Sequence, residues 1–337
     1  MWLKATGAES RNHPEAAEDA EAVHVITAGY HPGVKLSALN ALIAAVEAGS
    51  LRAAARRVGL SQPALTKLVR ELEQELSARL LERSSTGVIP TAQGRVLYER
   101  ARAATRELDH AVEQIEQLGG RMVGEISIGA VPLAVLLLVP EALRTFGQAF
   151  PLIGLRVAEE LYIAQLTNLR TGATDVALGP IPTGLTPGEF HIEPLMPATM
   201  VVVCRRGSRW ATARSLAELA EARWVYTSAG GATGYAALMH TSHGLEPPPA
   251  AAVVNSTLGL LSLIGSSDHV GLMPEAIMAH PLATQFLQVI PAVDGRLDLT
   301  IGAITQPETL LKPAVRHFLA HLHRAAHQLS RGAVPAV

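Results

Sequence analysis

GSLRAAARRVGLSQPALTK, residues 49–67, predicts two short helices joined by a tight turn. Ser50 and Ser61 each stand just before one of these helices, where a hydroxyl can accept an otherwise unpaired amide hydrogen. Gly59 supplies a turn conformation that other residues enter only with strain. Pro63 is compatible with the first turn of the second helix, because that turn has no amide partner to lose.

The second of these helices, which begins after Ser61, has one apolar and one polar face. The apolar residues recur at helical spacing and are predicted to be buried; they are Leu65, Leu68, Val69, Leu72 and Leu76. The outer face keeps Gln62, Pro63, Thr66, Lys67 and Arg70. A helix-turn-helix whose second helix has a polar, basic face suits the major groove of DNA.

The segments around this motif resemble the LysR-type transcriptional regulators. They are SQPALTK (61–67), RELE (70–73), LLER (80–83) and PTAQG (90–94), and the correspondence runs without a gap from residue 36 to 94. Weaker resemblance continues to about residue 329. The resemblance implies a winged helix-turn-helix and a long linker helix. A two-lobed α/β effector domain, with a fold like that of periplasmic binding proteins, follows them.

The resemblance assigns DNA-binding roles to eight side chains. Gln62, Pro63, Thr66 and Lys67 are expected at base edges, and Arg52, Ser61, Arg70 and Arg83 mostly at phosphate and sugar. Residues 35–95 carry nine Lys/Arg and five Asp/Glu, a net charge of +4 on a chain whose net charge is −2. Charge alone would favour a merely solvated helical surface, but with the motif it indicates contact with phosphate.

A long helix is predicted from residue 92 to about 118, after Thr91 as its cap. Its apolar positions alternate in steps of four and three; they are Leu97, Ala101, Ala104, Leu108, Ala111, Ile115 and Leu118. This spacing predicts a coiled-coil seam between two subunits. The alternative is packing within its own domain, since three positions are alanine. A dimer would read an inverted-repeat operator. The resemblance implies a homotetramer, and RNA polymerase is a candidate partner.

Composition and strand–helix alternation predict the domain boundaries. Residues 1–34 are polar, acidic and without periodicity, so a disordered arm is expected. The predicted domains are the winged helix-turn-helix (35–91), the linker and dimerisation helix with a glycine hinge (92–121), and the effector domain (122–337). In the effector domain, alternating strands and helices predict parallel sheets. Its two lobes are assigned to residues 122–196 with 296–330, and to residues 197–295.

Two crossings between lobes predict a hinged cleft for a small effector. Strand ends and helix starts supply the candidate effector-binding residues; these are Ala130, Val131, Pro132, Gly179, Pro180, Thr199, Thr227, Ser228, Gly230, Gly231, Thr233 and Asn255, with Ser256 and Thr257 beside the last. Many relatives carry Ser or Thr where this chain has residues 130–132, which favours a less polar or aromatic ligand, such as an aromatic or organic acid. Loops that only turn the chain, and a cleft that binds nothing, are the alternatives.

Other functions find less support in the sequence. His317, His321, His323 and His327 form two pairs on one predicted helix and could make a metal-responsive regulator, but the pairs point in different directions and solvated histidines are expected. Cys204 is expected to be a buried strand residue. No catalytic motif is found, so no enzyme and no cofactor are predicted. A solute-binding protein would leave the DNA-binding motif unexplained. One cysteine and no signal peptide or membrane span predict a cytoplasmic protein.

Overall fold

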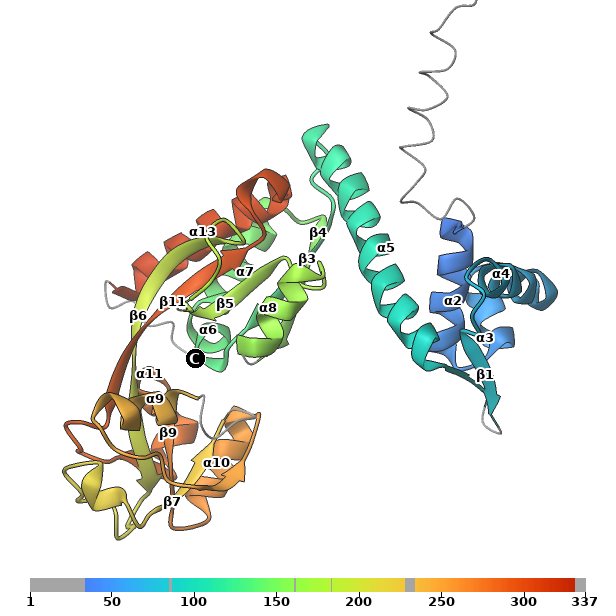
Figure 1. Cartoon of the computed structure of the whole chain (residues 1–337). Coiled ribbons are helices and arrows are strands. Elements are labelled where there is room, and N and C mark those ends of the chain that lie inside the picture. The colour runs from blue at the N-terminus through green and yellow to red at the C-terminus, as the bar shows by residue number, and fades with distance from the viewer. Residues whose placement is uncertain (1–33, 85–86, 161, 183, 228–233, 331–337) are drawn as a thin grey trace, which may run out of the picture. The chain divides into compact units, whose positions relative to one another are not determined.

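The computed structural model describes residues 34–84, 87–160, 162–182, 184–227 and 234–330 (Figure 1). Contacts divide the chain into two compact units, the first ending at Thr105 and the second beginning at Arg106. The division therefore falls inside helix α5 (Ala92–Leu118) rather than after it. Residues 1–33 of the predicted arm lie outside the described residues, while Val34 packs against the first unit's core.

The first unit contains the predicted helix-turn-helix. Its helices are α2 (Leu36–Ala48), α3 (Leu51–Arg57) and α4 (Gln62–Glu75). Ser50 Oγ accepts the amide hydrogen of Ala53 at 3.5 Å, and Ser61 Oγ accepts that of Ala64 at 3.3 Å. Gly59 has φ of 69°, in the left-handed region that favours glycine. Both caps and the turn are thus as predicted.

A two-stranded antiparallel wing follows the three helices. Its strands are β1 (Leu81–Ser84) and β2 (Gly87–Pro90). Val88 donates its amide hydrogen to Gly49 O at 2.8 Å, which fixes the wing to the turn between α2 and α3. Gly87 has φ of 140°, and a Cβ there would lie 2.2 Å from the same carbonyl oxygen. Only glycine allows this close approach.

The second unit is built on one sheet that runs through both lobes. Its strands are β3 (Gly124–Ala130), β4 (Ile153–Glu159), β5 (Val176–Pro180), β6 (His191–Arg205), β7 (Arg223–Tyr226), β8 (Ala250–Val253), β9 (His269–Pro274), β10 (Leu287–Val289) and β11 (Arg296–Thr305). Among the described residues their order is β4-β3-β5-β11-β6-β9-β7-β8, and β10 also pairs with β6. Figure 1 shows β6 and β11 extending from one lobe into the other.

The sheet is mixed, which corrects the prediction of parallel sheets. Within the lobes the pairs β3–β4, β3–β5, β7–β8 and β7–β9 are parallel. Strand β11 is antiparallel to β5 and β6, and β6 is antiparallel to β9. The two crossing strands carry the chain in opposite directions between the lobes, so they cannot join a purely parallel sheet. The apolar run at residues 200–204 predicts a strand that starts at residue 200, but β6 already begins at His191.

Helices cover the sheet and complete its hydrophobic cores. They are α6 (Pro132–Leu137), α7 (Val139–Ala149), α8 (Tyr162–Arg170), α9 (Tyr235–Ser242), α10 (Thr257–Gly265), α11 (Glu275–Met278), α12 (Pro281–Thr284) and α13 (Pro313–Ser330). In the first lobe Phe146 on α7 meets Phe318 on α13 edge to face, with ring centroids 5.3 Å apart. In the second lobe Trp224 is fully buried against His240. Within the described residues, no helix combines the length and apolar character needed to cross a membrane.

Candidate functional site

The outer face of α4 gathers the predicted base-reading residues. Gln62, Pro63, Thr66, Lys67 and Arg70 line one shallow hollow together with Glu71 and Gln74. Thr66 donates its hydroxyl to Gln62 O at 2.8 Å, which leaves its oxygen lone pairs for a further partner. Lys67 Nζ lies 3.7 Å from Glu71 Oε1 in an exposed pair, which costs little to break.

The residues predicted to contact phosphate and sugar are Arg52, Ser61, Arg70 and Arg83. Arg52 and Arg70 are exposed on α3 and α4. Ser61 is exposed too, and its hydroxyl already serves as the cap of α4. Arg83 belongs to β1, but its side chain lies outside the described part of the chain. The face is thus polar and basic and suits the edge of a base pair.

Between the lobes of the second unit lies a cavity of about 110 Å³. This is close to the size at which an apolar cavity holds a single small ring. Five predicted effector-binding residues line it, namely Val131, Pro132, Pro180, Thr227 and Asn255, as do Ser256 and Thr257. They come from both lobes, so one small molecule here would contact both.

Three predicted residues do not line the cavity. Ala130 and Gly179 are buried within their strands, and Thr199 donates its hydroxyl to Asp298 Oδ1 at 2.7 Å. Successive side chains of a strand point to opposite faces, and on β6 it is Ala198 and Met200 that line the cavity. Ser228, Gly230, Gly231 and Thr233 lie outside the described residues.

Sequence reasoning missed the apolar wall of the cavity. Six of its members are Leu260, Leu272, Met273, Ile277, Leu299 and Ile301. Leu299 and Ile301 alternate along β11, and they could have been predicted from this period of two. The wall agrees with the expectation of a less polar ligand.

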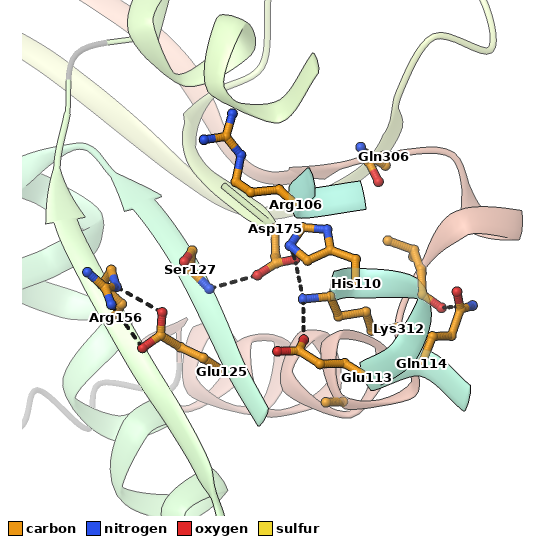
Figure 2. A network of polar contacts seen from close by, with 12 residues as sticks. Arg106, His110, Glu113, Gln114, Glu125, Ser127, Arg156, Asp175, Gln306 and Lys312 are labelled. Atoms are coloured by element: carbon orange, nitrogen blue, oxygen red, sulfur yellow. Dashed lines mark hydrogen bonds and ion pairs between the residues drawn. The ribbon is translucent and has the colours of Figure 1, made fainter. Parts of the chain in front are cut away.

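A network of buried and half-buried charges lies where the end of α5 meets the first lobe (Figure 2). Lys312 Nζ is 2.8 Å from Glu113 Oε2 and 3.1 Å from Asp175 Oδ1, with only 6% of the lysine side chain exposed. Asp175 Oδ2 accepts the amide hydrogen of Ser127 at 2.8 Å. His110 Nε2 is 4.0 Å from Asp175 Oδ1. The last turns of α5 are therefore part of the effector-binding unit.

The four C-terminal histidines lie on α13 (Pro313–Ser330). Among the described residues, no group of three or more metal-ligating side chains comes together. The prediction that all four are solvated is wrong for His321, which is buried and lies 2.8 Å from Thr145 Oγ1 through its Nδ1. Burial lowers the pKa of His321, and Arg324 and His317 lower it further. Cys204 is buried, and desolvation raises the pKa of its thiol, which disfavours the reactive thiolate.

Comparison with known proteins decides the family. A model of the LysR substrate binding domain matches residues 119–327, and a model of the bacterial regulatory helix-turn-helix protein of the lysR family matches residues 36–95. The chain belongs to the LysR family of transcriptional regulators. This family consists of regulators rather than enzymes, and its helix-turn-helix rules out a free-standing solute-binding protein.

Individual relatives are distant. HTH-type transcriptional regulator TdcA of Escherichia coli is 28% identical over 184 residues, and the match spans 53% of this chain but only 58% of that relative. GbpR of Azospirillum brasilense is 26% identical over 89% of each chain. TfdS of Cupriavidus pinatubonensis is 29% identical over 86% of this chain and 98% of its own.

The fold of this LysR-family chain matches a solved family member. The crystal structure of CbnR, a LysR family transcriptional regulator, superposes with a TM-score of 0.66 at 23% identity, covering 87% of this chain and 99% of that one. At this identity the likeness concerns the fold alone.

Proposed function

We propose that this LysR-family chain is a cytoplasmic DNA-binding regulator whose activity is set by a small apolar effector in the interlobe cavity. The cavity carries this proposal, because its lining comes from both lobes around the two crossing strands. A ligand that contacts both lobes binds their closed arrangement more tightly than an open one and so shifts the equilibrium between them.

DNA recognition is assigned to α4. Gln62, Pro63, Thr66 and Lys67, which line the hollow of α4, would read base edges, and the nearby basic residues would hold phosphate. The chain acts as a homodimer through α5 on an inverted-repeat operator, and two dimers form a tetramer. It has no catalytic activity and needs no cofactor besides the effector.

The test is a thermal-shift screen of the full-length chain against single-ring amines, alcohols and acids. A ligand at about 100 times its Kd adds roughly 2.7 kcal/mol of stability, which raises Tm by several degrees. The hit is then repeated on Ala198→Phe, which fills the cavity, and on Ala149→Phe, an exposed alanine of α7. The shift should vanish in the first variant and persist in the second. A shift that survives Ala198→Phe would place the effector elsewhere.

A further inference from the structure

The charged lining of the interlobe cavity is entirely acidic. Among the described lining residues the ionisable side chains with a formal charge are Glu159 and Glu160, at the end of β4 and just beyond it, and none is Lys, Arg or His. A carboxylate ligand would therefore meet two like charges and no cationic partner.

Glu160 is held in place by three hydrogen bonds. Its amide hydrogen goes to Ala130 O at 3.0 Å, and its carbonyl oxygen accepts from Gln165 Nε2 at 3.1 Å. Its Oε2 accepts from Asn168 Nδ2 at 2.9 Å. An ionised carboxylate can accept about four hydrogen bonds, so this one retains capacity for a donor from a ligand.

A second acceptor lies beside the cavity lining. Gln165 is fully buried and gives its Nε2 hydrogens to Glu160 O and to Leu178 O, while its Oε1 has no hydrogen-bond partner. A Cβ built on Gly179 would lie 3.2 Å both from this Oε1 and from Cγ1 of Val131, a lining residue. Gln165 does not itself line the cavity, so its unpaired carbonyl oxygen adds partial negative charge behind the lining, which disfavours an anionic ligand.

The helix N-termini at the cavity attract an anionic ligand only weakly. Helix α6 begins at Pro132, which has no amide hydrogen, and it is six residues long. At α10 the Ser256 side chain already accepts the amide hydrogen of Gly259. A helix terminus carries about half an elementary charge at most, whereas Glu159 and Glu160 carry two full negative charges.

We infer that the effector is an amine: a single ring or short apolar chain with a cationic ammonium head directed at Glu160 and the neighbouring acceptors. The apolar body fits the wall of Leu272, Met273 and Ile301, and the head supplies the positive charge that the described lining lacks. This assignment rests on the proposed function of the same cavity and narrows the chemistry of its ligand.

The experiment uses three probes of one shape, namely benzylamine, benzyl alcohol and benzoate. Their Kd values on the full-length protein are measured by titration calorimetry at fixed salt. We expect benzylamine to bind at least tenfold more tightly than benzoate, with the alcohol between them. Glu160→Gln keeps an acceptor for Asn168 but removes the charge, so it should weaken benzylamine at least fivefold and leave the alcohol unchanged. Glu221→Gln, at an exposed position outside the cavity, should alter none of the three.

The outcomes separate this inference from the proposed function. If benzoate binds most tightly and Ala198→Phe abolishes its binding, the cavity is the effector site but the ligand is not an amine. If another library compound binds in the cavity, the same comparison is made with its own head-group analogues, and preference for the anionic one overturns the inference. If no compound of any head group binds in the cavity, the proposed function itself fails. An unchanged affinity of benzylamine for Glu160→Gln and Glu159→Gln also contradicts the assignment.

Discussion

Substitution of the single residue Thr66 tests whether α4 contacts the base edges of the operator. Thr66 sits in the hollow of α4 with its hydroxyl bonded to Gln62 O and its oxygen lone pairs still available. Thr66→Ala should cost about 1–3 kcal/mol in binding to the operator and little in binding to random DNA. Fluorescence anisotropy titrations of both DNAs at one salt concentration measure this difference.

Arg52 provides the matched comparison, because it is an exposed cation on α3 with an expected role at phosphate. Arg52→Ala should weaken operator and random DNA alike and reduce the slope of log affinity against log salt by about 0.9. Equal losses on both DNAs for Thr66→Ala would contradict its role at a base edge.

Local rules predicted some residues well and others poorly. The caps at Ser50 and Ser61 depend only on neighbours in the sequence, so they could be predicted. Thr199 was expected to line the cavity but does not. The direction of its side chain depends on the register of β6, and the first half of that strand was not predicted. The prediction that His321 is solvated was wrong, because its burial depends on how α7 packs against α13.

At the scale of elements, α5 shows what a periodic pattern can and cannot establish. The predicted helix is present, from Ala92 to Leu118. The seven-position seam, however, is divided. Leu97 packs against the first unit's core and Ala101 is buried, whereas Leu108, Ile115 and Leu118 are exposed. Periodicity predicts that a stripe is apolar but not which neighbour covers each part of it.

Lys312 forms ion pairs that join the end of α5 to the first lobe. Replacing this lysine should therefore lower the free energy of unfolding. Lys312→Met leaves Asp175, whose side chain is 9% exposed, and Glu113 without their cation. Removing one partner of a buried pair typically costs about 3–5 kcal/mol. Urea unfolding of the full-length chain, followed in the transition of the effector-binding unit, measures the loss.

Two further variants make the Lys312 prediction specific. Lys35→Met changes an exposed lysine in the same way and should alter stability by no more than about 0.5 kcal/mol. Asp175→Asn in the Lys312→Met background should restore part of the loss, because it removes one of the charges left unpaired. A loss for Lys312→Met no larger than that for Lys35→Met would show that the network is not stabilising.

At the scale of the whole molecule, the sequence predicted two lobes and two crossings but not one sheet through both. The lobes follow from alternating strands and helices, which are local patterns. The long strands β6 and β11 pair in a register that shifts between Ile301 and Gly302, and such pairing of distant segments has no local signature. In the apolar cavity wall, Leu299 and Ile301 alternate along β11 and carry a local signal, whereas members on other elements are brought to them only by such distant pairing.

The exposed part of the α5 seam bears on assembly. The seam residues Leu108, Ile115 and Leu118, together with Val112 outside the predicted seam, are 51–73% exposed and form an apolar stripe along the helix's second half. Such a stripe on an amphipathic helix favours a partner helix. Ile115→Lys places a charge in this seam, so we expect the dimer to dissociate at micromolar concentration, which sedimentation velocity detects as a smaller species.

Operator binding by Ile115→Lys should fall with the dimer, because a monomer engages one half-site and loses the gain from linking two. Asp109→Asn changes the net charge by the same amount at an exposed position of the same helix and should leave sedimentation unchanged. If Ile115→Lys sediments like the unmodified chain, another surface holds the subunits together. A random-DNA control separates the two effects of the added lysine, since its charge would raise nonspecific affinity while the lost dimer lowers operator affinity.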